Sequence, residues 1–565
     1  PIMSLSFQQA IEQVCAPGGL FEITETEVRG IPTKVFAGTP PNLRFLYQMA
    51  AEREDEFVIY EDERWTMPEV LKLSGQLGSA LEKKFSIQKG DRVAIAMRNY
   101  PEWIAAFAAI TSIGAVAVPL NAWWEPDELG FALNDSGAKV VFADIERIRK
   151  ISDSNVNIRT LEIIKVRSES QDNFDINLLE SLLESDSTMP EVEIDPDENA
   201  TILYTSGTTG KPKGAVSSHR AILSALLGFS ARAQVAELVE PQKGDNEKAQ
   251  RNSFMLCVPL FHVTGLIPVM LGSFVGQSKL VMMHKWEPDR ALELIEKEYV
   301  THFIGVPTMS WDLLEAETFN SRDTSTLRSV GGGGAPMPPE LVKRIDENFK
   351  RGKPGLGYGM TETNAYGPQN TGKEFLDHPR STGRPVPIMQ LRVTDSDGNV
   401  LSAGEKGELW FNGPTIITEY WNRPEATEES IVDGWLRSGD IGHIDDEGRV
   451  FVSDRVKDMV LRGGENIYCA EVEASIYELP EVYECSVYGV PDERLGEKVA
   501  CHIMVRQGES LTAEQVADGL QGQIAPFKIP ELIVIVKDPL PRNASGKILK
   551  RELRETATNL SVADI

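Results

Sequence analysis

Residues 205–214 (TSGTTGKPKG) have the residue types needed to hold a phosphate group. They follow an apolar stretch, 200–204, whose composition predicts a strand. Glycines let backbone N–H groups approach a phosphate closely, hydroxyls donate hydrogen bonds to it, and lysines neutralise its charge. The segment does not match the Walker loop, G-x-x-x-x-G-K-[ST], because position 205 is Thr and Lys211 is followed by Pro212. It predicts a phosphate-binding loop of another kind, and the alternative is a polar, glycine-rich hairpin.

Two charged residues further along the chain could bind the sugar and phosphate of a nucleotide. Asp440, in the segment SGD, can accept two hydrogen bonds from a ribose diol, although an aspartate beside a glycine is also typical of an ordinary turn. Arg455 follows fifteen residues later and could supply a second contact to ribose or phosphate.

Lys547 lies in a small basic island near the C-terminus. Its basic neighbours are Arg542, Lys550, Arg551 and Arg554, and the single acid among them is Glu552. A run of charge usually forms a solvated surface. Because Gly546 precedes Lys547 in a turn-rich loop, we expect this lysine to be able to swing inward toward a bound anion.

Together with further segments in the same order, these residues resemble the motifs of the adenylate-forming superfamily. That superfamily includes acyl-CoA synthetases, luciferases and the adenylation domains of peptide synthetases. The matching segments are 205–214 (TSGTTGKPKG), 334–336 (GAP), 358–362 (YGMTE), 438–440 (SGD), 454–458 (DRVKD) and 541–547 (PRNASGK). The resemblance runs from roughly residue 40 to 555.

The resemblance implies a set of site residues. ATP or AMP would be bound by Thr205, Ser206, Gly207, Thr208, Thr209, Gly210, Lys211, Gly334, Ala335, Pro336, Tyr358, Gly359, Met360, Thr361, Glu362, Asp440, Arg455 and Lys547. Catalysis would involve Lys547, Thr205, Glu362 and His262, with Glu362 and Thr205 on Mg²⁺. Coenzyme A would pass Arg462, Gly463 and Gly464, the acyl pocket would include His262, Gly333, Gly359 and Met360, and Lys457 would be the hinge.

The implied residues suit adenylate formation on chemical grounds. A carboxylate can attack the α-phosphate of ATP directly, so the reaction needs cations around a negative transition state rather than a Ser/His/Asp triad. Mg²⁺ prefers oxygen ligands and often takes one carboxylate plus phosphates and waters, which favours Glu362, with a hydroxyl of the Thr205 loop as the weaker candidate. Glu362 could also start a helix after Thr361, and the two interpretations are compatible.

Three of the implied assignments have structural alternatives. His262, in 259–265 (PLFHVTG), could gate the acyl pocket or be a structural histidine at a strand end. Gly463 and Gly464 could admit the pantetheine arm or form a tight turn. The four glycines at 331–334 are costly in chain entropy, and they could form a wall without side chains beside the acyl group or serve the backbone only.

The alternation of apolar segments predicts an α/β fold with a parallel sheet in its first part. Predicted strands are 91–97, 115–119, 139–143 and 200–204, and predicted helices are 102–113 and 127–136. The uncharged stretch 103–124 is long enough to cross a bilayer. Because Gly114 and Pro119 interrupt it, we expect a buried helix and strand and no transmembrane segment. Residues 152–198 are expected at the surface, and 231–251 as a long exposed loop.

The pattern of predicted secondary structure changes after residue 384. Short segments at 391–394, 407–412 and 450–453, with Asp-Gly turns, predict an antiparallel subdomain. A second, small α/β unit follows, with helices at 470–479 and 512–524 and strands at 484–488 and 498–505. The expected domains are an extended N-terminal arm (1–40), a large AMP-binding domain (41–456) and a small mobile C-terminal domain (457–565).

Composition limits the classes of partner. The formal charge of −28 over 565 residues argues against nucleic acid, because phosphate backbones require basic surface. Five cysteines without CxxC spacing predict neither a disulfide framework nor a structural zinc site, so a cytoplasmic enzyme is expected. A homodimer is a separate expectation. No signal peptide is visible in the sequence.

We therefore expect a ligase that joins a small-molecule carboxylic acid to coenzyme A through an acyl-adenylate, releasing AMP and diphosphate. A fatty or other hydrophobic acid is favoured, since Phe261, Val263, Leu266, Trp311 and Met360 offer no obvious cation for a second carboxylate. An adenylation enzyme that passes an aryl or acyl group to a separate carrier protein is the nearest alternative. Two further alternatives are a luciferase-type oxidation and a non-catalytic nucleotide-binding relative. A non-catalytic relative would be expected to have a degraded motif, which the sequence does not show.

Overall fold

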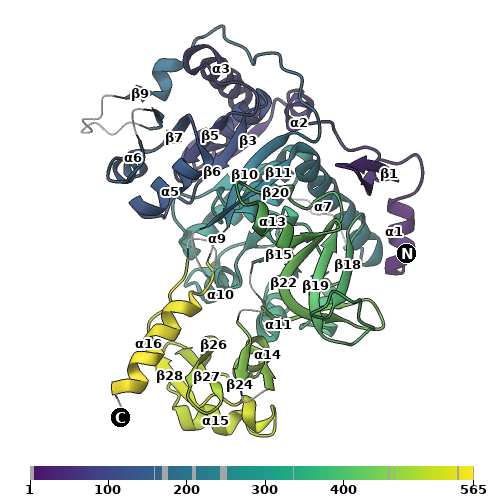
Figure 1. Cartoon of the computed structure of the whole chain (residues 1–565), viewed down its shortest axis with the longest axis vertical. Coiled ribbons are helices and arrows are strands. Elements are labelled where there is room, and N and C mark those ends of the chain that lie inside the picture. Colours follow the sequence, from purple (N-terminus) through teal and green to yellow (C-terminus); the bar gives the residue numbers. More distant parts are fainter. Residues whose placement is uncertain are drawn as a thin grey trace.

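The computed structural model describes residues 5–157, 160–167, 176–205, 212–241, 251–334, 336–455, 458–462, 465–543 and 546–563. A large N-terminal domain carries two eight-stranded sheets and an antiparallel sheet, counted over these residues, and a small C-terminal domain lies beside it (Figure 1). The predicted α/β class, the antiparallel subdomain and the small C-terminal domain are thus confirmed.

The first large sheet begins the site, because its strands lead into the phosphate segment. Its strands are β5 (Arg92–Ala96), β6 (Val116–Pro119), β7 (Val140–Ala143), β8 (Glu162–Lys165), β9 (Asn177–Leu178), β10 (Asn199–Thr205), β11 (Lys213–Ser218) and β20 (Glu419–Tyr420). Among the described residues the order is β20-β11-β10-β6-β5-β7-β8-β9, with β11 antiparallel to both neighbours. The central strands are apolar throughout because helices cover both faces. Ile164 and Val166 are buried, so this part of the stretch predicted as surface belongs to the sheet.

The second large sheet holds the glycine run. Its strands are β3 (Glu56–Tyr60), β4 (Glu63–Thr66), β12 (Ser253–Leu256), β13 (Lys279–Met282), β14 (His302–Gly305), β15 (Ser329–Gly333), β16 (Lys353–Gly357) and β17 (Gln369–Thr371). A Cβ on Gly331 would lie 1.9 Å from the Gly355 carbonyl oxygen, and one on Gly332 would lie 1.7 Å from that of Gly305. These two glycines are therefore required by the neighbouring backbone.

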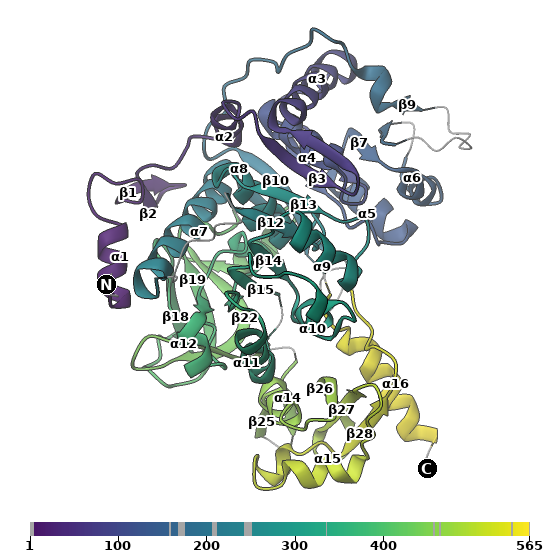
Figure 2. The ribbon, with the colours of Figure 1, turned by 180° about the vertical axis from the view of Figure 1, so that it is seen from behind.

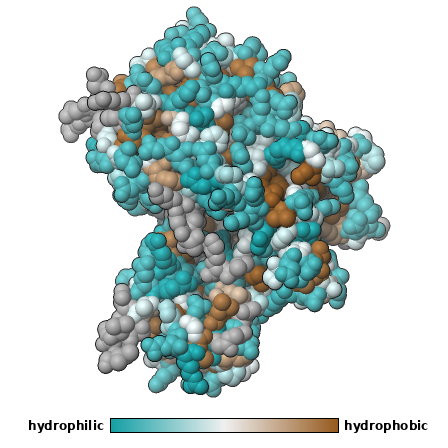
Figure 3. Space-filling view, viewed as in Figure 1, coloured by the Kyte–Doolittle hydropathy of each residue, from teal (hydrophilic) through white to brown (hydrophobic). Residues whose placement is uncertain are grey.

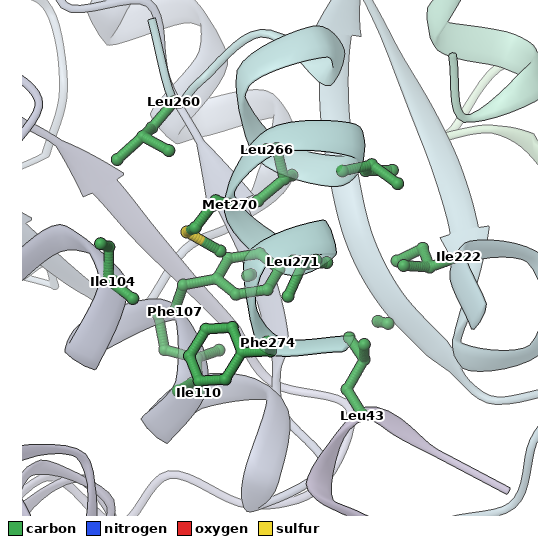
Figure 4. Close-up of a cluster of buried hydrophobic side chains, with 14 of the residues drawn as sticks. Leu43, Ile104, Phe107, Ile110, Ile222, Leu260, Leu266, Met270, Leu271 and Phe274 are labelled. Carbon is green, nitrogen blue, oxygen red and sulfur yellow. The ribbon is translucent and has the colours of Figure 1, made fainter. Parts of the chain in front are cut away.

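Helices fill the space between and around the two sheets. They are α2 (Leu43–Ala50), α3 (Met67–Phe85), α4 (Pro101–Ser112), α5 (Pro126–Ser136), α6 (Ile145–Ser152), α7 (His219–Val239), α8 (Gly272–Val275), α9 (Pro288–Lys297), α10 (Pro307–Glu315), α11 (Pro339–Asn348) and α12 (Gly372–Asp377). Shorter turns of helix are η1 (Leu179–Leu182), η2 (Gly265–Leu271), η3 (Phe319–Ser321) and η4 (Thr361–Thr363). Side chains from α4, α7, η2 and α8 meet in the main core, among them Phe107, Ile222, Met270 and Phe274 (Figure 4). The buried helix and strand expected within 103–124 are confirmed as α4 and β6.

Helix α7 corrects the prediction of an exposed loop over 231–251. The helix continues to Val239, and Ala231 and Val235 are buried, because the spacing of Leu227, Ala231 and Val235 keeps one apolar face turned inward. Among the described residues, α7 is the one helix long and apolar enough to cross a membrane. Half of its apolar stretch is buried inside the protein, and a core helix passes the same test of length and composition.

The N-terminal segment is folded rather than extended. It forms α1 (Phe7–Val14), which Ser6 and Gln9 cap reciprocally, and the hairpin of β1 (Ile23–Val28) and β2 (Ile31–Phe36). The Leu5 N–H donates to the Leu238 carbonyl (3.1 Å), so α1 lies beside the end of α7. Ala10 and Phe36 are buried, which explains why an arm of mixed composition folds against the large domain.

The antiparallel sheet completes the large domain. It contains β18 (Gln390–Thr394), β19 (Gly407–Asn412), β21 (Ile431–Val432), β22 (Trp435–Ile444) and β23 (Val450–Arg455), with α13 (Pro424–Ser430) leading into β21. Asp433 and Gly434, both at positive φ, form the two-residue turn between β21 and β22, as Asp-Gly predicts. The register of β22 and β23 places Asp440 opposite Arg455.

The small domain has one sheet with helices packed against it. Its elements are β24 (Val460–Arg462), β25 (Glu465–Ile467), α14 (Cys469–Ile476), β26 (Val482–Asp492), β27 (Gly496–Val505), α15 (Ala513–Leu520), η5 (Pro526–Lys528), β28 (Leu532–Val536) and α16 (Lys550–Ala563). Val472, Val487, Val499 and Ile503 form its separate core. In both ribbon views the domain lies below α10 and α11 of the large domain (Figure 2). The face drawn in Figure 3 is mainly hydrophilic, with hydrophobic residues scattered over it.

Candidate active site

Tyr358 and Asp440 meet although 82 positions separate them in the chain. Tyr358 follows β16, and its hydroxyl donates a hydrogen bond to Asp440 Oδ2 on β22 at 2.6 Å. Arg455 Nε lies 3.7 Å from the other Asp440 oxygen, as the strand register requires. The Asp440 side chain is largely buried, and burial raises the pKa of its carboxyl while Arg455 opposes the rise. The two segments that resemble adenine- and ribose-binding motifs therefore form one site.

The loop of Lys547 belongs to the small domain and contacts the large one. Its loop is closed by the Lys547 N–H donating to Asn543 Oδ1 and the Asn543 N–H donating to the Lys547 carbonyl, both at 2.9 Å. Gly546, at φ +80°, lies against Val306, so the loop contacts the large domain where β14 ends. Burial, followed by the nearby Arg455, lowers the pKa of Lys547 to about 8, while Asp458 and Asp440 oppose that shift.

Glu362 lies on η4, beside the strands that flank the phosphate segment. Tyr420 on β20 donates a hydrogen bond to Glu362 Oε1 at 2.7 Å, and the Glu362 residue is 7% exposed. Strand β20 pairs with β11, which begins at Lys213. The Lys213 ammonium lies 4.4 Å from the centre of the Tyr420 ring. The carboxylate is therefore held next to the strand that leaves the phosphate segment.

A single carboxylate fits magnesium better than a metal that needs a full protein cage. Within the described ranges, no group of three or more His, Cys, Asp or Glu residues could hold a metal ion. Mg²⁺ often binds through one carboxylate together with phosphate oxygens and waters. Tyr420 occupies Oε1 of Glu362, and no hydrogen bond among the described residues uses Oε2. Thr205, at the end of β10, donates its hydroxyl to the Lys213 carbonyl at 3.3 Å and keeps its oxygen lone pairs.

Several predicted site residues lie outside the described residues. They are Ser206, Gly207, Thr208, Thr209, Gly210, Lys211, Ala335, Lys457, Gly463 and Gly464. The structure places the flanking residues. Thr205 pairs with Lys213 across β10 and β11, while Gly334, at φ +84°, and Pro336 are both exposed.

The residues predicted for the acyl pocket lie at strand ends of the second large sheet and after β12. Gly333 ends β15, and Gly359 and Met360 follow β16, all three partly exposed. His262 precedes η2, and its Nδ1 accepts the Thr264 N–H at 3.4 Å. Burial lowers the pKa of His262 to about 4, so the ring is neutral at pH 7.

The sequence matches known proteins over nearly all of its length. Residues 45–421 match the model of the AMP-binding enzyme, and residues 471–547 match that of the AMP-binding enzyme C-terminal domain. The chain belongs to the AMP-binding enzyme family. It is 34% identical to the long-chain-fatty-acid–CoA ligase FadD13 of Mycobacterium tuberculosis, over 87% of this chain and 93% of that protein.

Other relatives of this AMP-binding enzyme act on different acids. A feruloyl-CoA synthase of Amycolatopsis sp is 34% identical, over 83% of this chain and 89% of that protein. The solved o-succinylbenzoate CoA synthetase of Bacillus subtilis, in complex with its acyl-adenylate intermediate, is 28% identical with a TM-score of 0.76. That alignment covers 91% of this chain and 98% of the solved chain. The chain is accordingly an AMP-forming acyl-CoA ligase.

In this AMP-binding enzyme, α10 of the large domain contacts the small domain through polar and aromatic side chains. Asp312 accepts hydrogen bonds from Tyr483 of the small domain (3.0 Å) and from Trp286 of the large one (2.8 Å). Arg506 pairs with Glu315 at 2.5 Å and lies 4.7 Å from the Trp311 ring centre. Trp311 therefore belongs to the domain interface, and its place near the acyl pocket stays a prediction.

The predicted CoA residue that the structure describes lies on the small domain. Arg462, at the end of β24, forms an ion pair with Glu531 at 2.8 Å. In this arrangement the guanidinium is held by its own domain while the Lys547 loop contacts the large domain. Arg462 and the loop of Lys547 thus occupy separate positions. Two half-reactions that use them in turn would need such a separation.

Sequence reasoning did not find Tyr420 or Arg232. Tyr420 lies in the segment EYWN, whose composition carries no chemical signal, and it becomes relevant through its bond to Glu362. Arg232 was assigned to an exposed loop, whereas it lies on α7 with its guanidinium beside Gly357. The continuing apolar spacing along α7 was the signal that could have placed it.

Proposed function

We propose that this ligase activates a carboxylic acid with an apolar body and transfers it to coenzyme A. In the first half-reaction a carboxylate oxygen attacks the α-phosphorus of ATP, and the bond to diphosphate breaks. In the second, the sulfur of coenzyme A attacks the acyl carbon and AMP leaves. ATP and coenzyme A are the co-substrates expected for this family.

The observation that carries this proposal is the group formed by Tyr358, Asp440 and Arg455, with the loop of Lys547 held against the large domain at Val306. Asp440 and Arg455 would bind the ribose, with Tyr358 and Gly334 to Pro336 on the adenine side. Lys547 would neutralise charge that develops between the attacking carboxylate and the α-phosphate. Preorganised cations of this kind contribute about 3 kcal/mol to transition-state stabilisation.

The phosphate segment and Glu362 would hold the remaining charge of the nucleotide. Residues Thr205 to Lys211 would surround the phosphates, and Glu362, with Thr205, would bind Mg²⁺. The bound ion would draw charge from the phosphate oxygens. Tyr420 supports this role for Glu362 because it fixes one carboxylate oxygen and leaves the other available.

The small domain, which we place after residue 456, would rotate about Lys457 between the half-reactions. The present arrangement, with Lys547 inserted, would serve adenylation. In the other arrangement Arg462, Gly463 and Gly464 would border the pantetheine path. Free thiols at all five cysteines support a cytoplasmic location, and a homodimer remains a prediction.

The acyl group would lie between His262 and the ends of β15 and β16. Val263 and Leu266 are buried in the main core, and Met360 packs against the same cluster, which supports an apolar body for the acid. His262, neutral at pH 7, could contact the carboxyl end without adding charge.

A half-reaction assay tests the proposal. The protein is incubated with ATP, Mg²⁺ and a panel of acids, and diphosphate release, AMP and thioester are followed separately, with coenzyme A or a holo-carrier protein as acceptor. We expect diphosphate release for at least one acid and thioester formation with free coenzyme A. The absence of diphosphate release with every acid, from protein that binds ATP, contradicts the activity, and transfer to the carrier alone contradicts the acceptor.

A further inference from the structure

Arg232 is a fixed cation on the third turn from the end of α7. Its Nη1 donates a hydrogen bond to the Gly367 carbonyl at 2.9 Å. The guanidinium lies 5.0 Å from the centre of the Phe229 ring and 5.9 Å from that of Tyr366. These contacts hold the planar group in one orientation while part of the residue stays accessible.

No carboxylate among the described residues forms an ion pair with Arg232. The fully buried arginines of the large domain differ, since Arg44, Arg53 and Arg147 pair with Glu191, Asp55 and Asp144. Burial lowers the pKa of Arg232 to about 10. Even a partly buried cation without a counter-ion is costly to the fold. A ligand that brings its own negative charge would remove that cost.

The guanidinium faces the acyl side of the site. A Cβ on Gly357 would lie 3.8 and 3.9 Å from the two terminal nitrogens of Arg232, so the guanidinium lies next to the last residue of β16. Gly357 is opposite Gly333 in the sheet register and immediately precedes Tyr358. In parallel sheets, ligands bind at the carboxyl ends of the strands. Both Gly333 and Gly357 are partly exposed there.

We propose that Arg232 binds a second carboxylate at the distal end of the acid, so that the substrate is a dicarboxylic acid with an apolar body. The inference rests on the proposed function and names its substrate class. One carboxyl group is activated near Lys547, and the other accepts hydrogen bonds from the guanidinium nitrogens that Gly367 does not use. Phe229 and Tyr366 flank the position with aromatic surface, which suits the apolar body between the two charges.

The test compares acids matched in length. Wild-type protein is assayed for diphosphate release with straight-chain dicarboxylic acids from succinic to sebacic acid, each against the monocarboxylic acid of the same carbon count. The variants are Arg232→Met, which keeps the volume without the charge, and Arg232→Lys, which keeps the charge without the planar fork. Arg220→Met is the control, because Arg220 lies on the same helix and pairs with Asp197 away from the site.

We expect at least one diacid to exceed its matched monoacid by about 100-fold in kcat/KM, since a site built to pair a buried polar group rejects an analogue that lacks it. Arg232→Met should abolish that ratio through loss of diacid activity, Arg232→Lys should retain part of it, and Arg220→Met should leave it unchanged. If Arg232→Met does not fold, the proposal is tested by the ratio of diacid to monoacid kcat/KM in the wild type and in Arg232→Lys.

Adenylation of monoacids by the wild type with no diacid preferred overturns this inference and leaves the proposed function intact. The same holds if Arg232→Met lowers activity on both members of a pair equally, since the residue then serves only the fold. If none of the acids leads to diphosphate release, both this inference and the proposed function are overturned.

Discussion

The Tyr420 hydroxyl donates a hydrogen bond to Glu362 Oε1 across 2.7 Å, joining a strand edge to a short helical turn 58 residues earlier. The Tyr420 side chain is itself buried and contacts the Lys213 ammonium through its ring. This tyrosine is therefore a positioning residue: it orients the carboxylate that we assign to magnesium.

Tyr420→Phe should weaken metal use without abolishing adenylation. The ring and its packing remain, but the lost hydrogen bond to a charged group is worth about 1.5–3 kcal/mol. We expect the Mg²⁺ concentration for half-maximal rate to rise about tenfold or more, with a smaller change in the maximal rate. Glu362→Gln is the comparison and should lower the maximal rate even at saturating Mg²⁺. An unchanged Mg²⁺ dependence in Tyr420→Phe would remove the positioning role.

Lys547→Ala should lose the first half-reaction selectively. Removing a cation from the transition state costs about 3 kcal/mol, or roughly a hundredfold in rate. Diphosphate release should fall by that amount, whereas thioester formation from supplied acyl-adenylate should persist. Equal loss of both steps would contradict the assignment of Lys547 to adenylation.

The pH dependence of adenylation should report Lys547. Its pKa is lowered to about 8, so the protonated, active fraction falls as the pH rises through 8. We expect kcat/KM for ATP, which reflects the free enzyme, to decline above that pH. Lys547→Arg keeps a charge that does not titrate in this range, so its residual activity should show no such decline. If kcat/KM for ATP of the wild type stays constant up to pH 9, deprotonation of Lys547 does not control adenylation.

The domain interface should bias the enzyme toward adenylation. Tyr483→Phe removes the hydrogen bond to Asp312, and Arg506→Ala removes the pair with Glu315 and the contact with Trp311. Each change should slow diphosphate release a few-fold, at about 1 kcal/mol per hydrogen bond, without slowing thioester formation from supplied adenylate. Arg551→Ala, an exposed change on the small domain, serves as the control. Slowing of both steps would mean that the contacts stabilise the fold rather than one arrangement.

Glycine substitutions should show whether the backbone packing of the second large sheet requires Gly332. Gly332→Ala places a methyl group against the Gly305 carbonyl and should destabilise the protein by about 3 kcal/mol or more. Gly355→Ala is the matched control on the neighbouring strand, since its Cβ would meet nothing closer than 3.6 Å. Denaturant unfolding measures both. Comparable stabilities would show that the sheet adjusts to the added methyl group.

Local chemistry explains which parts of the site were visible in the sequence. Glycines, hydroxyls and cations at 205–214, an aspartate beside a glycine at 440 and a lysine beside a glycine at 547 carry their signal in a few adjacent residues. Strands such as β5 and β7 and the Asp433-Gly434 turn were predictable for the same reason, because alternation and turn chemistry are local. The part of helix α7 beyond Ala231 was not predicted. Polar residues on its outer face obscured the helical spacing of apolar residues, such as Val235, on its inner face.

The pairings that make the site depend on the order and register of whole sheets. Tyr358 meets Asp440 because the antiparallel sheet packs at the end of β16, and Tyr420 meets Glu362 because β20 adds to the edge of β11. Arg232 meets Gly357 because α7 brings its side chain next to the end of β16. Each of these contacts joins residues separated by 58 to 125 positions in the chain. Such contacts follow from how complete layers bury their apolar faces against one another, and no short stretch of sequence contains that information.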